Sequence, residues 1–213
     1  RFSFTTDIIL PPYHFLRLHE VFQISVLILL STLLAFFLLK EISGNFELLK
    51  TRKGTLLGTM FIAGVYFSST GNGLHEVASY FFNTFCNTTI IENMACGSMY
   101  FNDYYFGNIL YFAGLFFTNL SLILLEIMRP NKNYTKKDFS INIVNSLILG
   151  FMFFAYAAFD KVLVGLFFTI FAAVTTDIIL VMSKRKYLSL PFTSYCAMAY
   201  TIAAVGSTIV RLQ

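Results

Sequence analysis

Six apolar segments of about twenty residues dominate this 213-residue chain. An α-helix of that length, at a rise of about 1.5 Å per residue, crosses the hydrocarbon core of a bilayer. A strand barrel would alternate apolar and polar positions, whereas residues 26–30 are apolar on every face. The chain is therefore predicted to be an all-α, polytopic transmembrane helical bundle with six spans. The predicted spans are 21–39, 54–72, 107–128, 141–159, 162–182 and 190–210.

The balance of apolar and charged residues supports one membrane domain over residues 1–213. The chain is 57% hydrophobic and 12% charged, and a typical soluble domain is about a quarter charged. The charged residues form short clusters between the spans, and no polar stretch is long enough to fold separately. The net charge of +4 lies in these short loops, so nucleic-acid binding is not expected, and membrane lipids are the expected partners.

Lysine and arginine are unevenly distributed between alternate loops, which predicts the orientation. Eleven of the fifteen basic residues fall on one side of the predicted bundle. By the positive-inside rule that side is cytoplasmic, and both termini are extracytoplasmic, in the plasma membrane or an endomembrane. The cytoplasmic set is Lys40, Lys50, Arg52, Lys53, Arg129, Lys132, Lys136, Lys137, Lys184, Arg185 and Lys186; the outer set is Arg1, Arg17, Lys161 and Arg211.

The long loop 73–106 falls on the outer side and carries features of an oxidising compartment. Cys86 and Cys96 are predicted to form a disulfide that closes a short loop. Asn87 begins the sequence Asn-Thr-Thr, an acceptor for N-glycosylation. Both features agree with the orientation predicted from the basic residues.

The stretch from Ser68 to Glu76 ends the second span and is the first candidate ligand site. Counted from Gly54, the helix has risen about 27 Å by Asn72, so Gly71 and Gly73 lie near the outer interface. One interpretation is a glycine C-cap, followed by an interfacial helix from His75 to about residue 85. A compatible interpretation is a helix break that exposes backbone groups to an anion or a lipid headgroup, with Gly71, Asn72 and Gly73 as binding residues.

The histidines form the second clue, because all three (His14, His19 and His75) are predicted at or beyond the outer interface. His19 and His75 each precede a glutamate, Glu20 and Glu76. If the first two spans are neighbours, these four side chains converge and could hold a divalent metal, zinc or iron.

The same convergence also suits acid–base chemistry. His75 could act as a general acid or base with Glu76 as its carboxylate partner, and Asp103 and Asp160 are expected nearby in outer loops. No HExxH or paired-cysteine pattern occurs, and an interfacial histidine is more often a hydrogen-bond partner than a ligand.

Polar residues in the inner half of the bundle have mostly structural interpretations. Glu126 is expected to pair with Arg129 one turn later. Asp177 lies deeper, and we consider both a pair with Lys184 and a role in ligand binding. Asn119 is expected to hydrogen-bond between helices.

Several absences narrow the function. The middle third of every predicted span lacks charged residues and histidine, which disfavours ion pumps and proton relays. No CxxC motif or nucleotide-binding glycine loop occurs. Two classes remain. The first is a lipid-modifying or hydrolytic enzyme that acts at the outer leaflet. The second is a non-enzymatic protein, either a transporter or binding protein for an uncharged or amphipathic ligand or a structural subunit of a membrane complex. The gathering of His, Glu, Asn and Gly at one rim favours the enzyme.

Overall fold

A computed structural model describes residues 8–12, 16–131, 134–160, 162–183 and 187–213. The predictions for His14 and for part of the basic loops lie outside these residues. The basic residues concerned are Arg1, Lys132, Lys161, Lys184, Arg185 and Lys186.

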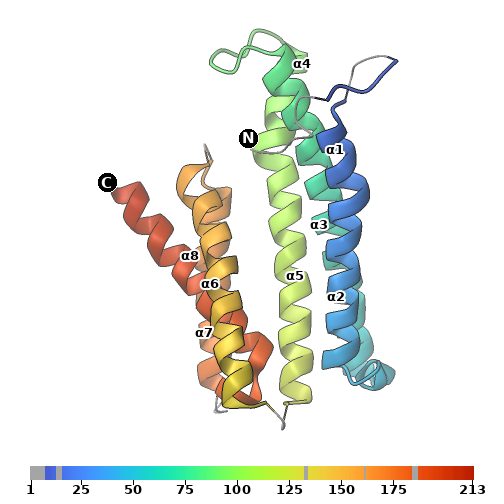
Figure 1. The fold of residues 1–213 in the computed structure, drawn as a ribbon, viewed down its shortest axis with the longest axis vertical. Coiled ribbons are helices and arrows are strands. Elements are labelled where there is room, and N and C mark those ends of the chain that lie inside the picture. The colour runs from blue at the N-terminus through green and yellow to red at the C-terminus, as the bar shows by residue number, and fades with distance from the viewer. Residues whose placement is uncertain (1–7, 13–15, 132–133, 161, 184–186) are drawn as a thin grey trace. The chain divides into compact units, whose positions relative to one another are not determined.

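The regular elements of the described residues are all helical (Figure 1). A π turn joins α1 to α2 (Gln23–Leu27), and another joins α4 to α5 (Asn102–Phe106), so each pair forms one continuous helix. Short 3₁₀ turns lie at Glu47–Lys50 and Tyr187–Ser189. The α-helices are α1 (Leu18–Phe22), α2 (Ile28–Ile42), α3 (Arg52–Phe85), α4 (Met94–Phe101), α5 (Gly107–Met128), α6 (Lys136–Phe159), α7 (Val164–Met182) and α8 (Pro191–Leu212).

Five helical stretches are long and apolar enough to cross a membrane, which supports a multi-pass membrane protein. They coincide with five of the six predicted spans. The remaining prediction, 54–72, falls within α3, whose glycines, serines and threonines dilute its apolar residues. The five stretches are Leu18–Ile42, Met94–Met128, Lys136–Phe159, Val164–Met182 and Pro191–Leu212.

The predicted helix break at Gly71 and Gly73 is wrong. The α3 helix continues through both glycines to Phe85. A Cβ on Gly71 would overlap the backbone of α5 at Gly107 and Tyr111, so this glycine permits close helix packing and does not end the helix. Consequently the loop between these helices is much shorter than the predicted 73–106. Only residues 86–93 separate α3 from α4.

The chain divides into two compact units. The first unit comprises residues Arg1–Phe37 and Ala63–Leu115. Within it, α3 and α5 approach at backbone distance: a Cβ on Gly107 would lie 3.0 Å from the amide nitrogen of His75, and one on Gly114 would overlap Gly64 and Ser68. These glycines fix the register that positions the polar side chains of the unit.

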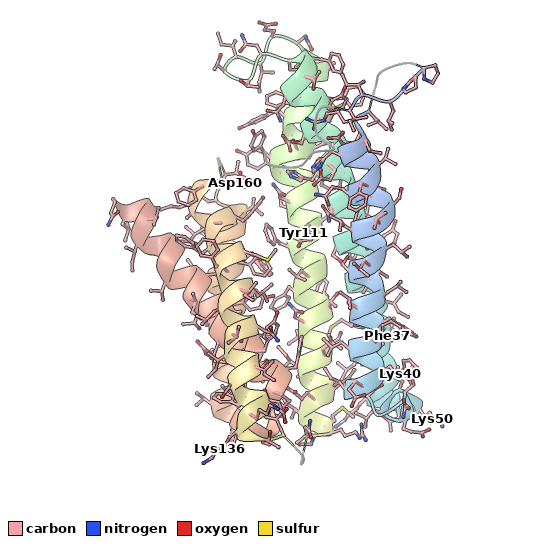
Figure 2. All side chains as sticks on the ribbon, in the orientation of Figure 1. Phe37, Lys40, Lys50, Tyr111, Lys136 and Asp160 are labelled. Carbon is pink, nitrogen blue, oxygen red and sulfur yellow. A yellow bond between two sulfur atoms is a disulfide. The ribbon has the colours of Figure 1, made fainter. Side chains whose placement is uncertain are left out.

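The second unit comprises residues Leu38–Ile62 and Phe116–Gln213. Here α8 packs against both α6 and α7, and Ala199 and Ala203 are fully buried in the contact. Small residues allow this close packing. Within this unit Lys40, Lys50 and Lys136 lie at one end, and Asp160 lies at the opposite end of α6 (Figure 2).

The predicted disulfide is confirmed. Cys86 and Cys96 are bonded, with their Cα atoms 5.7 Å apart. The bond joins the end of α3 to the first turn of α4, where the Asn93 side chain accepts a hydrogen bond from the Cys96 amide. Cys196 is a buried free cysteine.

Candidate functional site

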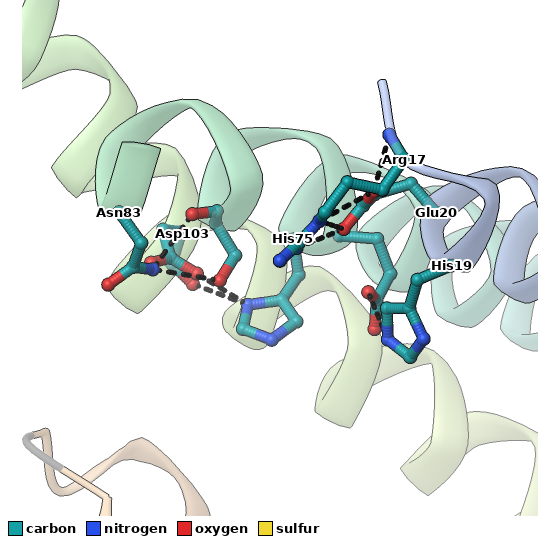
Figure 3. Close-up of polar contacts among 8 residues, drawn as sticks. Arg17, His19, Glu20, His75, Asn83 and Asp103 are labelled. Carbon is teal, nitrogen blue, oxygen red and sulfur yellow. Dashed lines mark hydrogen bonds and ion pairs between the residues drawn. The ribbon is translucent and has the colours of Figure 1, made fainter. Parts of the chain in front are cut away.

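A cluster of charged and polar side chains occupies one end of the first unit, on α1, α3 and the π turn before α5 (Figure 3). It contains both described histidines. It also contains three carboxylates and an arginine. The cluster is made of Arg17, His19, Glu20, His75, Glu76 and Asp103.

His75 and Asp103 form the centre of the cluster. The His75 Nδ1 atom lies 2.9 Å from the Asp103 Oδ1 atom and 2.9 Å from the Asp103 backbone oxygen. The Asp103 side chain is 2% exposed, whereas that of His75 is 31% exposed. The Asp103 backbone oxygen accepts the hydrogen bond of Nδ1, and the buried carboxylate lies at ion-pair distance beside it, so the imidazole is held in one orientation.

The π turn at Asn102–Phe106 explains why Asp103 is available to His75. A π turn widens the helix and shifts its hydrogen bonds by one residue, and such turns are frequent at functional sites. Here the Asp103 carbonyl oxygen accepts hydrogen bonds from the side chains of His75 (2.9 Å) and Asn108 (3.2 Å). Asn108 is buried and also donates to the Tyr104 carbonyl oxygen, which braces the turn.

The hydrogen bonds of His75 decide which ring nitrogen carries the proton. Both groups beside Nδ1 are oxygen acceptors, so Nδ1 must be the donor. In the neutral ring the lone pair is then on Nε2. No described residue hydrogen-bonds this Nε2 atom, which leaves it able to accept a proton from a ligand or from water.

Arg17 and Glu20 lock the start of α1 against α3. Glu20 is completely buried, and its carboxylate accepts from the Arg17 backbone amide (3.0 Å) and guanidinium (3.0 Å from Nε). The same guanidinium lies 4.7 Å from the centre of the Tyr80 ring on α3. This cation–π contact attaches the α1 pair to the helix that carries His75. From the sequence, Arg17 was expected only to be one of the outer basic residues.

His19 and Glu76 form a second, looser pair. The His19 Nε2 atom lies 3.9 Å from the Glu76 Oε2 atom. The prediction that Glu76 is the carboxylate partner of His75 is therefore wrong, because Asp103 occupies the Nδ1 side. The cause is the helical register, which turns the adjacent residue Glu76 toward α1.

The four predicted metal ligands do not form a common set. His19, Glu20, His75 and Glu76 do lie in one region, but Glu20 is bound by Arg17. In the described part of the chain, no group of three or more His, Cys, Asp or Glu side chains is arranged to hold a metal ion.

The remaining predicted ligand residues are dispersed. Gly71 packs against α5, and a Cβ on Gly73 would meet only the Ile28 side chain, at 3.9 Å. Asn72 is half-buried on α3. Asp160 and Asp177 belong to the second unit.

In the second unit, Asp160 and Asp177 make local contacts. The backbone oxygen of Asp160, at the end of α6, accepts a hydrogen bond from Arg211 (2.6 Å). The Asp177 carboxylate accepts from the Thr201 hydroxyl (3.1 Å). The predicted pair with Lys184 lies outside the described residues.

The predicted Glu126–Arg129 pair is wrong. The carboxylate of Glu126 instead accepts hydrogen bonds from the backbone amides of Phe192 (2.7 Å) and Thr193 (2.8 Å) at the start of α8. Pro191, the first residue of that helix, has no amide hydrogen, so these are the first free donors. The expected interhelical hydrogen bond of Asn119 is confirmed, with Tyr200 as its partner.

Comparisons with known proteins do not assign the chain: no protein-family model, curated protein or solved structure matches it. Function must therefore be inferred from the geometry of the side chains.

Proposed function

We propose that this protein is a membrane enzyme that uses His75 as a general base and acid on an amphipathic substrate at the outer membrane interface. The observation that carries the proposal is the His75–Asp103 pair: a buried carboxylate holds Nδ1 at 2.9 Å, and no described residue occupies Nε2.

The pair suits hydrolysis of an ester, amide or phosphoester. The Nε2 atom of His75 takes a proton from water as the water oxygen attacks the substrate, and Asp103 stabilises the imidazolium that forms. The imidazolium then gives this proton to the leaving group. No described serine, threonine or cysteine hydrogen-bonds Nε2, which favours water over a protein nucleophile. Asn72, which is half-buried on α3 one turn before His75, is the proposed headgroup contact.

We also propose that α3 is the sixth span and that both termini are extracytoplasmic. At 34 residues α3 is about 51 Å long, longer than the roughly 30 Å hydrocarbon core. The position of Lys40, Lys50 and Lys136 at one end of the second unit supports the positive-inside assignment (Figure 2). With five spans the termini would lie on opposite sides, so labelling tags at both ends in sealed cells tests the count.

On this orientation the loop with Asn87 is extracytoplasmic. The Asn87 side chain is exposed, and we propose it as a glycosylation site in a eukaryotic host. A mass shift after glycosidase treatment, absent in Asn87→Gln, tests the assignment.

The enzyme proposal is tested with the purified full chain and a panel of fluorogenic amphiphiles that carry ester, amide or phosphoester bonds. We expect turnover of one bond class, and a loss of about 100-fold or more in His75→Gln, because general acid–base catalysis contributes at least that factor. His19→Gln is the matched control, since His19 lies in the same cluster but touches Glu76. Turnover that persists in His75→Gln would remove His75 from the reaction and favour a ligand-binding or subunit role.

A further inference from the structure

The second unit contains a groove of about 1080 Å³ that is unrelated to the His75–Asp103 pair. Its walls are the C-terminal ends of α2 and α5, one face of α6, and the N-terminal end of α8. Binding sites for small molecules usually have volumes of roughly 300–1,000 Å³. The groove can thus hold a ligand of lipid size.

One wall of the groove is an apolar stripe on α6. Ile141, Ile148 and Met152 recur at helical spacing along this wall, and each is more than half exposed. From Ile141 to Met152 the stripe is about 17 Å long. It lies inside a helix that is apolar enough to span a membrane, so an alkyl chain is the ligand group that matches it.

The other end of the groove is polar, and two of its carboxylates are already occupied. Glu126 binds the first amides of α8. Asp138 accepts from the backbone amide (3.0 Å) and hydroxyl (2.7 Å) of Thr135. Burial, with the charges of Asp138 and Glu126, raises the pKa of Tyr134, so its phenol adds no charge.

Arg129 and Glu41 are the two remaining charged residues of the groove lining, and they do not neutralise each other. The Arg129 Nη1 atom reaches only the backbone oxygen of Glu41, at 3.4 Å. Neither side chain forms an ion pair with any residue that the structure describes. Gly44, with φ of +66°, leaves the space in which the Arg129 guanidinium lies. Among the groove side chains that are not bound to a helix N-terminus, one cation and one anion thus lie close together, at the end of an apolar channel.

We propose that this groove binds a zwitterionic amphiphile, a phospholipid or lysophospholipid with a phosphate and an ammonium group. The phosphate binds the Arg129 guanidinium, and the ammonium binds the Glu41 carboxylate. The alkyl chain lies along the α6 stripe. A headgroup that carries the phosphate but no ammonium leaves the Glu41 carboxylate without a cationic partner, and charge complementarity selects against it.

The test compares two probes with the same alkyl chain, lysophosphatidylethanolamine and lysophosphatidylglycerol, binding to the purified full chain. We expect about tenfold tighter binding of the zwitterion, the effect of one hydrogen bond to a charged group. Glu41→Gln should weaken only the zwitterion and so remove the preference. Arg129→Gln should weaken both probes, because both carry the phosphate.

Two further variants make the result decisive. Glu47→Gln is the matched control, because Glu47 is exposed near Glu41 in sequence but pairs with Lys50 and does not line the groove. Met152→Trp should lower the affinity for both probes without changing their ratio, since it fills the apolar end. Equal binding of the two probes by the unmodified protein, or a preference that survives Glu41→Gln, would overturn the proposal. Neither readout depends on turnover, so the groove and the His75 proposal fail independently.

Discussion

The two units use buried charges in different ways. In the second unit, Glu126 is 3% exposed, and hydrogen bonds from α8 bind both of its oxygens. In the first unit, Asp103 is equally buried but holds a half-buried histidine whose other nitrogen has no described partner. A carboxylate that accepts bonds from a helix end stabilises the fold, whereas one that holds a titratable ring prepares a group for proton transfer.

Arg211 extends the comparison. Its guanidinium donates to the backbone oxygens of Ala157 and Asp160, each at 2.6 Å, and so satisfies the carbonyl groups at the end of α6. Helix ends inside a membrane protein need such partners because water is scarce there. Glu126 and Arg211 therefore both have a structural role, because each forms hydrogen bonds with backbone groups at the end of a helix.

The strongest test of this comparison is Asp103→Asn. The substitution keeps the shape of the side chain but removes the charge that stabilises the imidazolium, so we expect turnover to fall by about 10³-fold. Thermal stability should change little. Nitrogen-15 spectra of the histidine ring would show whether Nδ1 still carries the proton. Unchanged turnover would show that Asp103, like Glu126, is a purely structural carboxylate.

The second test is Glu126→Ala, with an expected loss of about 3 kcal/mol in the free energy of unfolding. The reason is that two buried amides and the Thr193 hydroxyl lose their acceptor. Thermal unfolding in detergent measures the effect. Turnover per folded molecule should be unchanged, and a large fall in it would mean that the two units are not functionally separate.

The sequence predicted the fold class, and five of its six predicted spans coincide with apolar helices, because these features depend on local composition and length. It also placed His75 and Asp103 in one region. It could not identify Asp103 as the partner of His75, because the pairing depends on the π turn, and nothing in residues 102–106 signals a π turn. Glu126 was misassigned for a similar reason: its partners are 66 and 67 residues away, and only tertiary packing brings them together.

The glycines were the other source of error, and they give the third test. Gly71→Ala should destabilise the protein by about 2 kcal/mol, because its Cβ would overlap the α5 backbone. Gly73→Ala is the matched control. Its Cβ would make only an ordinary van der Waals contact, with the Ile28 side chain, and alanine favours a helix over glycine. The stability of this variant should therefore equal that of the unmodified protein or be slightly higher. If both substitutions destabilised the protein equally, the result would contradict the packing role of Gly71 and support the helix break predicted from the sequence.

The smallest expected effect concerns an uncharged contact of the second unit. Tyr200 is 1% exposed and accepts a hydrogen bond from Asn119 on α5. Tyr200→Phe removes the hydroxyl but keeps the ring, which lies 5.3 Å from the ring of Phe153. We expect a loss of about 0.6 kcal/mol, the usual value for a side-chain hydrogen bond between membrane helices. A loss as large as that of Glu126→Ala would show that the total number of buried hydrogen bonds, and not the capping of helix ends, stabilises this unit.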